Sequence, residues 1–127
     1  MPEYRAVLSP LPREAGANVR LHGFQRSKLT KELRTMAATA FKAFNVPSMG
    51  RARVHVSWVV GCTAISNKPF YSPRDVQNAI IALKPCIDGL IDAGVIQDDS
   101  YQFLEWGSTE IVKGKVPQVI IEVEQLA

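Results

Sequence analysis

The sequence has few of the features that mark secreted, membrane-spanning or zinc-stabilised proteins. It has only two cysteines, Cys62 and Cys86, which stand 24 positions apart with no Cys-x-x-Cys spacing. Neither a disulfide framework nor a zinc site is indicated, so we expect two buried free thiols in a reducing cytoplasm. The longest apolar stretches, such as residues 54–62, are far shorter than the roughly 20 residues of a membrane span. The N-terminal residues also lack the basic and apolar segments of a secretory signal.

The composition fits one globular domain over residues 1–127. Hydrophobic residues make up 46% of the 127 positions and charged residues 21%. A chain of this size buries roughly two thirds of its unfolded surface, so it needs no disulfide or metal for stability. The net charge of +3 is uneven: residues 1–60 carry ten basic and three acidic side chains (+7), and residues 61–127 carry five and nine (−4). Either the first half faces a polyanion, or both halves are ordinary solvated faces.

The first half predicts a strand, a helix and a second strand. Residues 4–8 alternate in polarity before two prolines, and residues 53–60 show the same period of two more clearly. Between them, a long basic loop over residues 9–27 precedes a helix over about 28–44, whose apolar residues fall on one face. His55, on the polar face of the second strand, has no partner at ligand spacing, and we expect a surface or cross-strand role for it.

The second half predicts a helix and then two strands. Apolar residues from Val76 to Ile91 repeat at helical spacing, with Pro85 inside the pattern and Gly94 at its end. We expect Pro85 to produce a kink or a tight turn near Lys84. Residues 101–112 and 119–123 are strand-like and predict a hairpin with a turn at 113–117. The expected fold is α+β in the order β-α-β-α-β-β, a mixed sheet of about four strands with two helices on one face.

Five aspartates lie within 25 residues of the second half. Asp75 would begin the second helix, where its side chain can cap free backbone donors, and Asp98 and Asp99 follow the end of that helix. A helix separates these carboxylates in sequence, so only the fold decides whether they meet. Composition alone is compatible with a helix cap and a polar turn.

Residues 74–99 resemble the RusA family of Holliday junction resolvases. Three ordered motifs carry the resemblance: Arg-Asp-Val-Gln-Asn at 74–78, Lys-x-x-x-Asp-x-Leu at 84–90, and Ala-Gly-x-x-x-Asp-Asp at 93–99. They cover about a fifth of the chain, and the order of the remaining elements agrees. The resemblance implies a crossover junction endodeoxyribonuclease of the phage or prophage type.

The resemblance also implies a Mg²⁺ site and a role for one lysine. Asp75 and Asp99 would be metal ligands, with Asp98 beside them, and the metal would activate water to cut a DNA phosphodiester. Lys84 matches the helix lysine of the family, where it would steady the phosphate or the developing charge. The alternative for Lys84 is an exposed i, i+4 ion pair with Asp88, worth a few tenths of a kcal/mol.

Gln77 stands where the family has a second acid in the turn. Its carbonyl oxygen can still coordinate a metal, but it attracts a divalent cation far less than a carboxylate does. We therefore count Gln77 with the catalytic and metal-binding positions. Three explanations stay open: a natural variant that cuts, a natural variant that only binds junctions, or a laboratory change that traps an uncleaved state.

The expected partners are branched DNA and a second copy of the chain, without a membrane. Two cuts on a nearly two-fold symmetric junction favour a symmetric homodimer with one site per subunit. Phe70 and Tyr71 either stack on bases opened at the crossover or pack onto the core. The basic side chains expected to contact phosphates are Arg13, Arg20, Arg26, Lys28, Lys68 and Arg74. The alternatives are a junction- or branched-DNA-binding protein without nuclease activity and a plain basic nucleic-acid-binding domain whose acids are structural.

Overall fold

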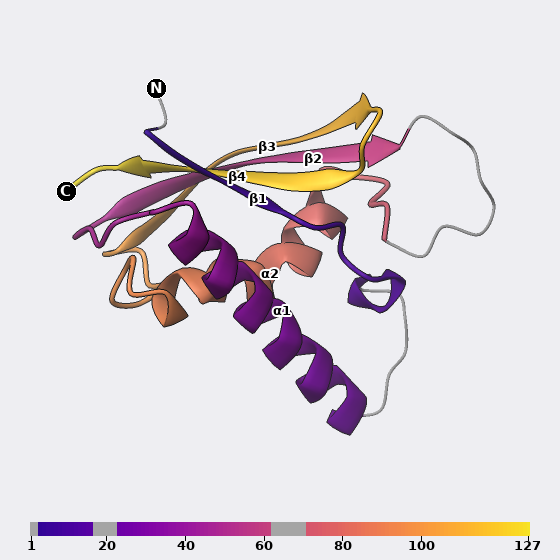
Figure 1. Cartoon of the computed structure of the whole chain (residues 1–127), viewed down its shortest axis with the longest axis horizontal. Helices are drawn as coiled ribbons and strands as arrows, with labels where there is room; N and C mark the ends of the chain where they lie inside the picture. The colour runs from indigo at the N-terminus through magenta and orange to yellow at the C-terminus, as the bar shows by residue number, and fades with distance from the viewer. Residues whose placement is uncertain (1–2, 17–22, 62–70) are drawn as a thin grey trace.

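A four-stranded mixed sheet and two helices form the two layers of the structure (Figure 1). It is a computed structural model that describes residues 3–16, 23–61 and 71–127. The elements are β1 (Tyr4–Leu8), the short 3₁₀ helix η1 (Arg13–Ala15), α1 (Gly23–Ala43), β2 (Ala52–Gly61), α2 (Val76–Asp92), β3 (Leu104–Gly114) and β4 (Gln118–Gln125). The predicted α+β class and the order of strands and α-helices are confirmed.

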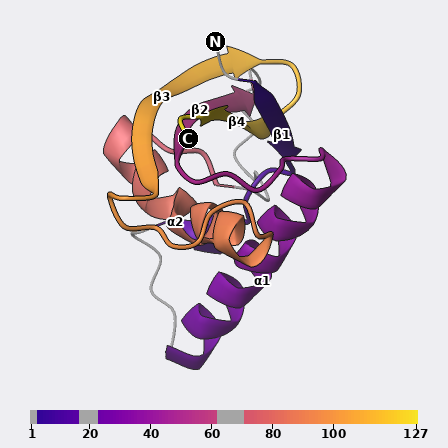
Figure 2. The ribbon, with the colours of Figure 1, turned by 90° about the vertical axis from the view of Figure 1, so that its left-hand side faces the viewer.

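Both helices lie on the same face of the sheet (Figures 1 and 2). Alternate residues of the two central strands, Val54, Val56 and Trp58 on β2 and Val119, Ile121 and Val123 on β4, are buried. They join apolar residues of α1 and α2, among them Phe41 and Leu83, in one core cluster. The period-two and helical patterns of the sequence therefore mark the two sides of a single core.

The strand order is β1-β4-β2-β3, so the predicted hairpin is wrong. β4 is antiparallel to both β1 and β2, whereas β3 runs parallel to β2 at the sheet edge. Residues 115–117 connect β3 to β4 across the end of β2, and the expected turn residues Lys113 and Gly114 belong to β3. Alternating polarity predicts that a segment forms a strand, but it does not specify which strand pairs with that segment. A short connection between two strands is therefore not sufficient to predict that they form a hairpin.

Helix α1 begins five residues earlier than its apolar pattern predicts. Its first turn is solvent-exposed, and Phe24 is 81% exposed. This turn therefore does not contribute to the apolar face that predicts where the helix begins. At the other end Phe44, expected on the buried face, follows the last helical residue Ala43 and is 47% exposed. Asn45 then takes a left-handed conformation (φ 59°), which stops the helix.

Helix α2 follows the sequence prediction closely. It begins after Asp75, continues through Pro85 to Asp92, and is followed by Gly94 at φ 77°, the left-handed conformation that glycine tolerates best. Gly89 lies where α2 crosses α1, and a Cβ there would stand only 2.8 Å from that of Ala37. Nearby, the Arg34 guanidinium donates two hydrogen bonds to Asp92, at 2.9 and 2.8 Å, and ties the two helices together.

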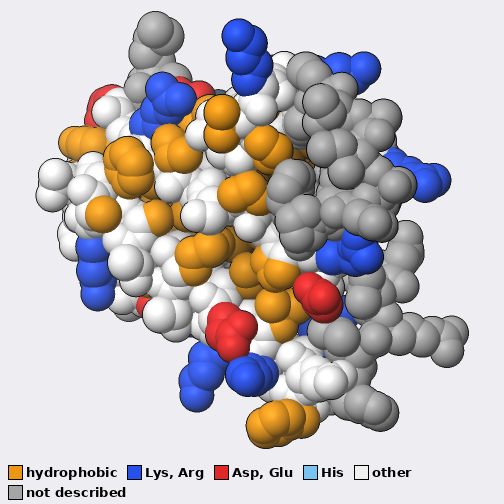
Figure 3. Space-filling model, turned by 45° about the vertical axis from the view of Figure 1, so that its right-hand side comes forward, with side chains coloured by type: hydrophobic (Ala, Val, Ile, Leu, Met, Phe, Trp, Pro, Cys, Tyr) orange, Lys and Arg blue, Asp and Glu red, His pale blue; other side chains and the backbone are white. Residues whose placement is uncertain are grey.

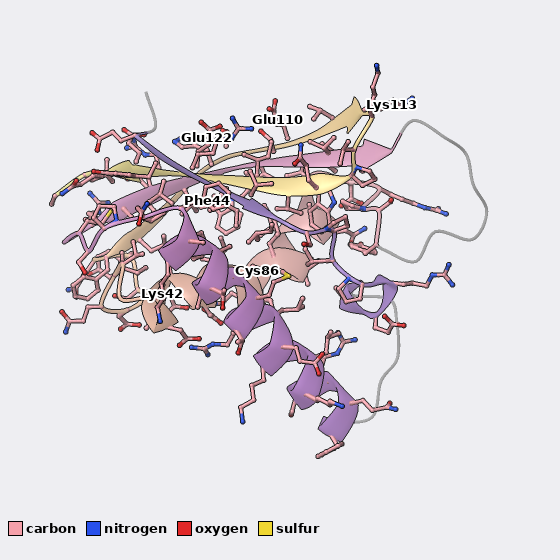
Figure 4. The ribbon with its side chains drawn as sticks, in the orientation of Figure 1. Lys42, Phe44, Cys86, Glu110, Lys113 and Glu122 are labelled. Carbon is pink, nitrogen blue, oxygen red and sulfur yellow. The ribbon has the colours of Figure 1, made fainter. Side chains whose placement is uncertain are left out.

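The outer face of the sheet is polar and lies away from the helices. Glu110 and Glu122 project from it in Figure 4. His55 makes cross-strand contacts there: Nδ1 lies 3.0 Å from Ser108 Oγ and Nε2 lies 3.2 Å from Glu124 Oε1. A cross-strand role, as expected for a histidine without ligand spacing, accounts for these contacts.

Cys86 is buried and free, as expected, and burial raises the pKa of its thiol to about 12. Cys62 lies outside the described residues. Within residues 3–16, 23–61 and 71–127, no helix combines the length and apolarity that crossing a membrane requires.

Candidate active site

Asp75 closes the N-terminus of α2. One carboxylate oxygen, Oδ1, accepts the backbone N–H of Asn78 at 2.8 Å, and Oδ2 accepts the Asn78 side-chain amide at 3.1 Å. This is the capping geometry that satisfies an otherwise unpaired donor of the first helical turn. Arg74 and Gln77 flank it and are exposed. The helix-cap interpretation of Asp75 is therefore confirmed.

Lys84 joins two acidic side chains that the sequence keeps apart. Its Nζ donates to Asp88 Oδ1 at 2.6 Å, one turn further along α2, and to Asp99 Oδ2 beyond the end of the helix. The side chain of Asp88 is only 19% exposed, while those of Lys84 and Asp99 are 56% and 37% exposed. The i, i+4 pair with Asp88 is thus confirmed, and Asp99 adds a second partner.

The loop after α2 brings Asp99 back to Lys84. The Val95 N–H bonds to the Leu90 carbonyl at 2.9 Å, which closes the end of the helix around Gly94. Val95 and Ile96 are buried and anchor the loop in the core. The Asp99 N–H donates to Asp98 Oδ1 at 2.7 Å, which orders the turn that presents both carboxylates.

The ion pairs shift the pKa values of the cluster. The Lys84 ammonium donates a hydrogen bond to Asp99 and lowers the pKa of that carboxyl below its ordinary value. Partial burial lowers the pKa of Lys84, but hydrogen bonds to Asp88 and Asp99 outweigh it, so the net shift is upward. Hydrogen bonding in the cluster therefore favours the charged forms of both Lys84 and Asp99.

The predicted metal-binding residues form two groups. Asp75 and Gln77 lie at the start of α2, and Asp98 and Asp99 lie beyond its end. Helix geometry places Asp75 about 13 Å before Lys84 along the axis, whereas Gln77 shares the face of Ile81, Lys84 and Asp88. In the part of the chain that the structure describes, no three acidic, histidine or cysteine side chains gather at one point. The donor set of Asp75, Gln77, Asp98 and Asp99 offers only oxygen atoms, which is the chemistry that Mg²⁺ prefers. The residues present therefore fit that ion by donor type.

Four of the six predicted phosphate-contacting residues are described. Lys28 is exposed on α1, Arg13 is exposed in η1, and Arg74 is exposed before α2. Arg26, on α1, is half-buried and donates to the Glu14 carbonyl at 3.2 Å, linking α1 to η1. Arg20 and Lys68 lie outside the described residues, as does Phe70.

Tyr71 packs onto the core. Its ring meets that of Trp58 edge-on, with centroids 5.8 Å apart, and burial raises the pKa of its hydroxyl. Its N–H donates to the Leu11 carbonyl at 2.8 Å. Of the two roles that the sequence left open for Tyr71, the structure favours packing.

An apolar hollow of about 520 Å³, which the sequence does not predict, lies beside Lys84 and Asp99. Ile80, Ile81 and Ile87 of α2 and Leu104 and Trp106 of β3 line the rest of it. Ile81 is 56% exposed although it lies in an apolar helix. The many isoleucines of α2 are the one feature of the sequence that points to an apolar surface here. The hollow itself depends on β3 lying next to α2, which local patterns do not encode.

Comparison with protein-family models gives no match, and comparison with curated proteins gives none either.

Proposed function

We propose that the chain is a Mg²⁺-dependent, structure-selective endonuclease that resolves four-way DNA junctions by paired symmetric nicks. The supporting observation is the Lys84 ammonium held between Asp88 and Asp99. It joins the lysine motif of α2 to the Asp-Asp motif at 98–99, two of the three segments that resemble RusA resolvases. A structural ion pair needs only Asp88, whereas a phosphate-cutting site needs a cation and carboxylates together.

The residues that would hold Mg²⁺ stand in two groups: Asp98 and Asp99 beside Lys84, and Asp75 with the carbonyl oxygen of Gln77 at the start of α2. When bound, that ion supplies polarisation of the phosphate and an activated water. Lys84 then stabilises negative charge on the phosphate oxygens, and Asp88 keeps the lysine charged and aimed at the site. Asp75 also fixes the start of α2, so one side chain combines capping and binding.

The DNA partner is supported by the charge of α1. This helix carries five basic side chains against the single acid Glu32. Figure 3 shows Lys and Arg side chains around much of the margin of one face, with hydrophobic side chains between them. Contacts of this kind neutralise phosphates without reading sequence, so they suit a structure-selective enzyme. We place the protein in the cytoplasm as a symmetric homodimer, one site for each of the two cuts.

A junction-binding protein without nuclease activity is the second candidate, and Gln77 favours it. Gln77 is exposed on the same face of α2 as Lys84, where a carboxylate would add negative charge toward a metal. A neutral amide there weakens cation binding but leaves the basic surface unchanged. Binding would then persist without cutting.

The test compares this chain with its Gln77→Glu and Gln77→Asp variants. Each acts on a synthetic four-way junction and on linear duplex of equal length, with Mg²⁺ and with EDTA. The control is Gln125→Glu, which adds the same charge at an exposed position at the end of β4. Paired nicks that need Mg²⁺ and occur only at the junction establish the resolvase.

Other outcomes identify the alternatives. If this chain binds junctions without nicking them, and the Gln77 variants but not Gln125→Glu restore cutting, the site is intact but inactive because of Gln77. Junction binding with no cutting by any variant leaves the junction-binding protein. Equal binding of branched and linear DNA without cutting would refute both and leave a basic domain with structural acids.

A further inference from the structure

Lys84 lies where two hollows of different character meet. On one side is the apolar hollow between α2 and β3 described above. On the other is a hollow of about 440 Å³ between α1 and α2, which shares Ile81 and Lys84 with the first and also includes Arg26, Thr30 and Asp88. The two hollows therefore adjoin at Ile81 and Lys84, and together with the hollow described next we call them the path.

The path continues onto a basic stripe of α1. A third hollow, of about 640 Å³, shares Arg26 and Thr30 with the second and adds Ser27, Lys31 and Arg34. Ser27, Thr30, Lys31 and Arg34 follow the i, i+3, i+4, i+7 spacing of one helix face. Asp92, the only acid among the described residues that line this hollow, is already paired with Arg34. This end of the path therefore suits phosphate, while the Trp106 end suits an apolar ring.

We propose that this path seats one strand of DNA, with its phosphates along α1 and an unpaired base in the hollow between α2 and β3. The backbone then passes over Lys84 between these two ends. The proposal deepens the nuclease function and rests on it for the choice of DNA.

The apolar hollow selects an unpaired base because the faces of paired bases are hidden within the duplex stack. Trp106 offers an aromatic surface, and its Nε1 donates to Thr109 Oγ1 at 2.6 Å, which fixes the indole orientation. Stacking of a base on such a ring contributes about 1–3 kcal/mol. Unpaired bases occur where a junction is opened at its crossover, so the path would favour branched over continuous duplex DNA.

The first experiment measures binding of a fluorescein-labelled oligothymidylate in EDTA, where no cutting interferes. Fluorescence anisotropy gives its affinity beside that of a duplex of equal length. We expect tighter binding of the single strand and about a tenfold loss in Ile81→Glu, which places a negative charge where the hollows meet. Val116→Glu is the matched control, since Val116 is 65% exposed in the turn between β3 and β4, and we expect less than a twofold change. If circular dichroism shows Ile81→Glu to be unfolded, Ile81→Gln replaces it.

Two further readouts locate the strand at its two ends. Oligothymidylate should quench tryptophan fluorescence in this chain but not in Trp106→Phe, whose remaining Trp58 is 2% exposed. Lys31→Gln should reduce the slope of log affinity against log salt by about 0.7, the value of one phosphate contact on a single strand. Lys113→Gln, exposed near the end of β3 and outside the residues that line the three hollows, should leave the slope unchanged.

The proposal is overturned if Ile81→Glu and Val116→Glu weaken binding equally, or if the oligonucleotide quenches no fluorescence. It is also overturned if Ile81→Glu converts a dimer to a monomer in light scattering while strand binding is unchanged, because the hollow would then hold a second copy. Failure of the nuclease function is a separate result. If the oligonucleotide binds along the path but no Gln77 variant cuts a junction, the strand-binding proposal stands and the nuclease proposal fails. If junction cutting is unchanged in Ile81→Glu, the nuclease proposal stands and the strand-binding proposal fails.

Discussion

At the scale of single residues, Lys84 links two carboxylates of the candidate site. One ammonium holds a mostly buried carboxylate, Asp88, and a more exposed one, Asp99. Exposed ion pairs contribute about 0.2–1 kcal/mol each, because solvent screens them and the long side chain loses freedom. The cluster therefore adds little stability for the charge it concentrates.

The variant Lys84→Met should reveal this small contribution through its pH dependence. The folded-state pKa of Asp99 lies below the ordinary value of 3.8, so the stabilisation is present above that value and is lost as the pH falls through the folded-state pKa. We expect a loss of about 0.5–1 kcal/mol in the free energy of unfolding at pH 7 and no difference from the wild type near pH 2. Urea denaturation at both pH values is the measurement. An equal loss at the two values would mean that the alkyl chain of Lys84, and not its charge, stabilises the fold.

Cys86 gives a second prediction at this scale. Its thiol is fully buried in the core and its pKa is raised to about 12, so almost no thiolate exists at neutral pH. In a Cys62→Ser variant, which leaves Cys86 as the only cysteine, we expect Ellman's reagent to react only as fast as the chain opens. The rate should rise to that of a free thiol in denaturing urea. Rapid reaction of the native variant would contradict the burial of Cys86.

At the scale of elements, α2 carries most of the candidate site, and its two ends differ in how far sequence predicts them. The Asp75 cap and the Gly94 stop depend on local chemistry, so both are visible in the sequence. The contact of Asp99 with Lys84 is not, because it requires residues 93–98 to fold back along the helix. The motifs therefore indicate which residues to consider for the candidate site, and the loop conformation determines which of them meet.

The sheet shows the same division between local and long-range information. Alternating polarity predicts β1, β2 and β4, and a strand-like stretch predicts β3, but the strand order could not be predicted, since β2 lies between the consecutive strands β3 and β4. Burial explains this in retrospect. β4 has a regular inward face at Val119, Ile121 and Val123, as expected for a strand paired on both sides, whereas β3 has no buried residue and occupies an edge.

Substitutions of Asp75 separate its two roles. Asn caps a helix about as well as Asp, so Asp75→Asn should leave the free energy of unfolding unchanged, while Asp75→Ala should lower it by about 1 kcal/mol. If Asp75 also binds Mg²⁺, both variants lose junction cutting but retain junction binding. Urea denaturation and a junction-nicking assay measure the two properties side by side. Cutting is assayed in the Gln77→Glu background, so that an effect of Gln77 itself does not mask that of Asp75. Retained cutting by Asp75→Asn would remove Asp75 from the metal site.

The crossing of α1 and α2 depends on Gly89. Alanine at this position would gain about 1 kcal/mol of helix propensity, but its Cβ would lie 3.0 Å from the Arg34 carbonyl oxygen, on the backbone of α1. Overpacking of this kind costs about 1–3 kcal/mol, so we expect Gly89→Ala to destabilise the protein despite the better helix former. Gly23→Ala is the control, since a Cβ there meets no atom of the described residues within 4 Å. If thermal denaturation shows Gly89→Ala to be as stable as Gly23→Ala, then α1 and α2 move apart to accommodate the added methyl group with little loss in the free energy of unfolding.

At the scale of the whole molecule, the proposed function divides the surface between two faces. The outer face of the sheet balances its charges internally, with Arg53 bonded to both Glu105 and Glu124. The helical side has an excess of basic groups on α1 and carries the candidate site on α2. A DNA junction would therefore approach the helices, and the outer face of the sheet would stay in solvent.

The proposed homodimer predicts how mixed chains behave on a cruciform plasmid. Two nicks made within one complex give linear DNA, whereas one nick gives an open circle. Wild-type chain, or its Gln77→Glu variant if that is the active form, would be mixed with an excess of Asp99→Asn, so that most active subunits pair with an inactive one. Because each subunit cuts one strand, we expect linear product to be replaced by open circles, as gel electrophoresis would record. Dilution with an inert protein is the control, and a fall in linear product without a rise in open circles would mean that the two cuts do not require two paired sites.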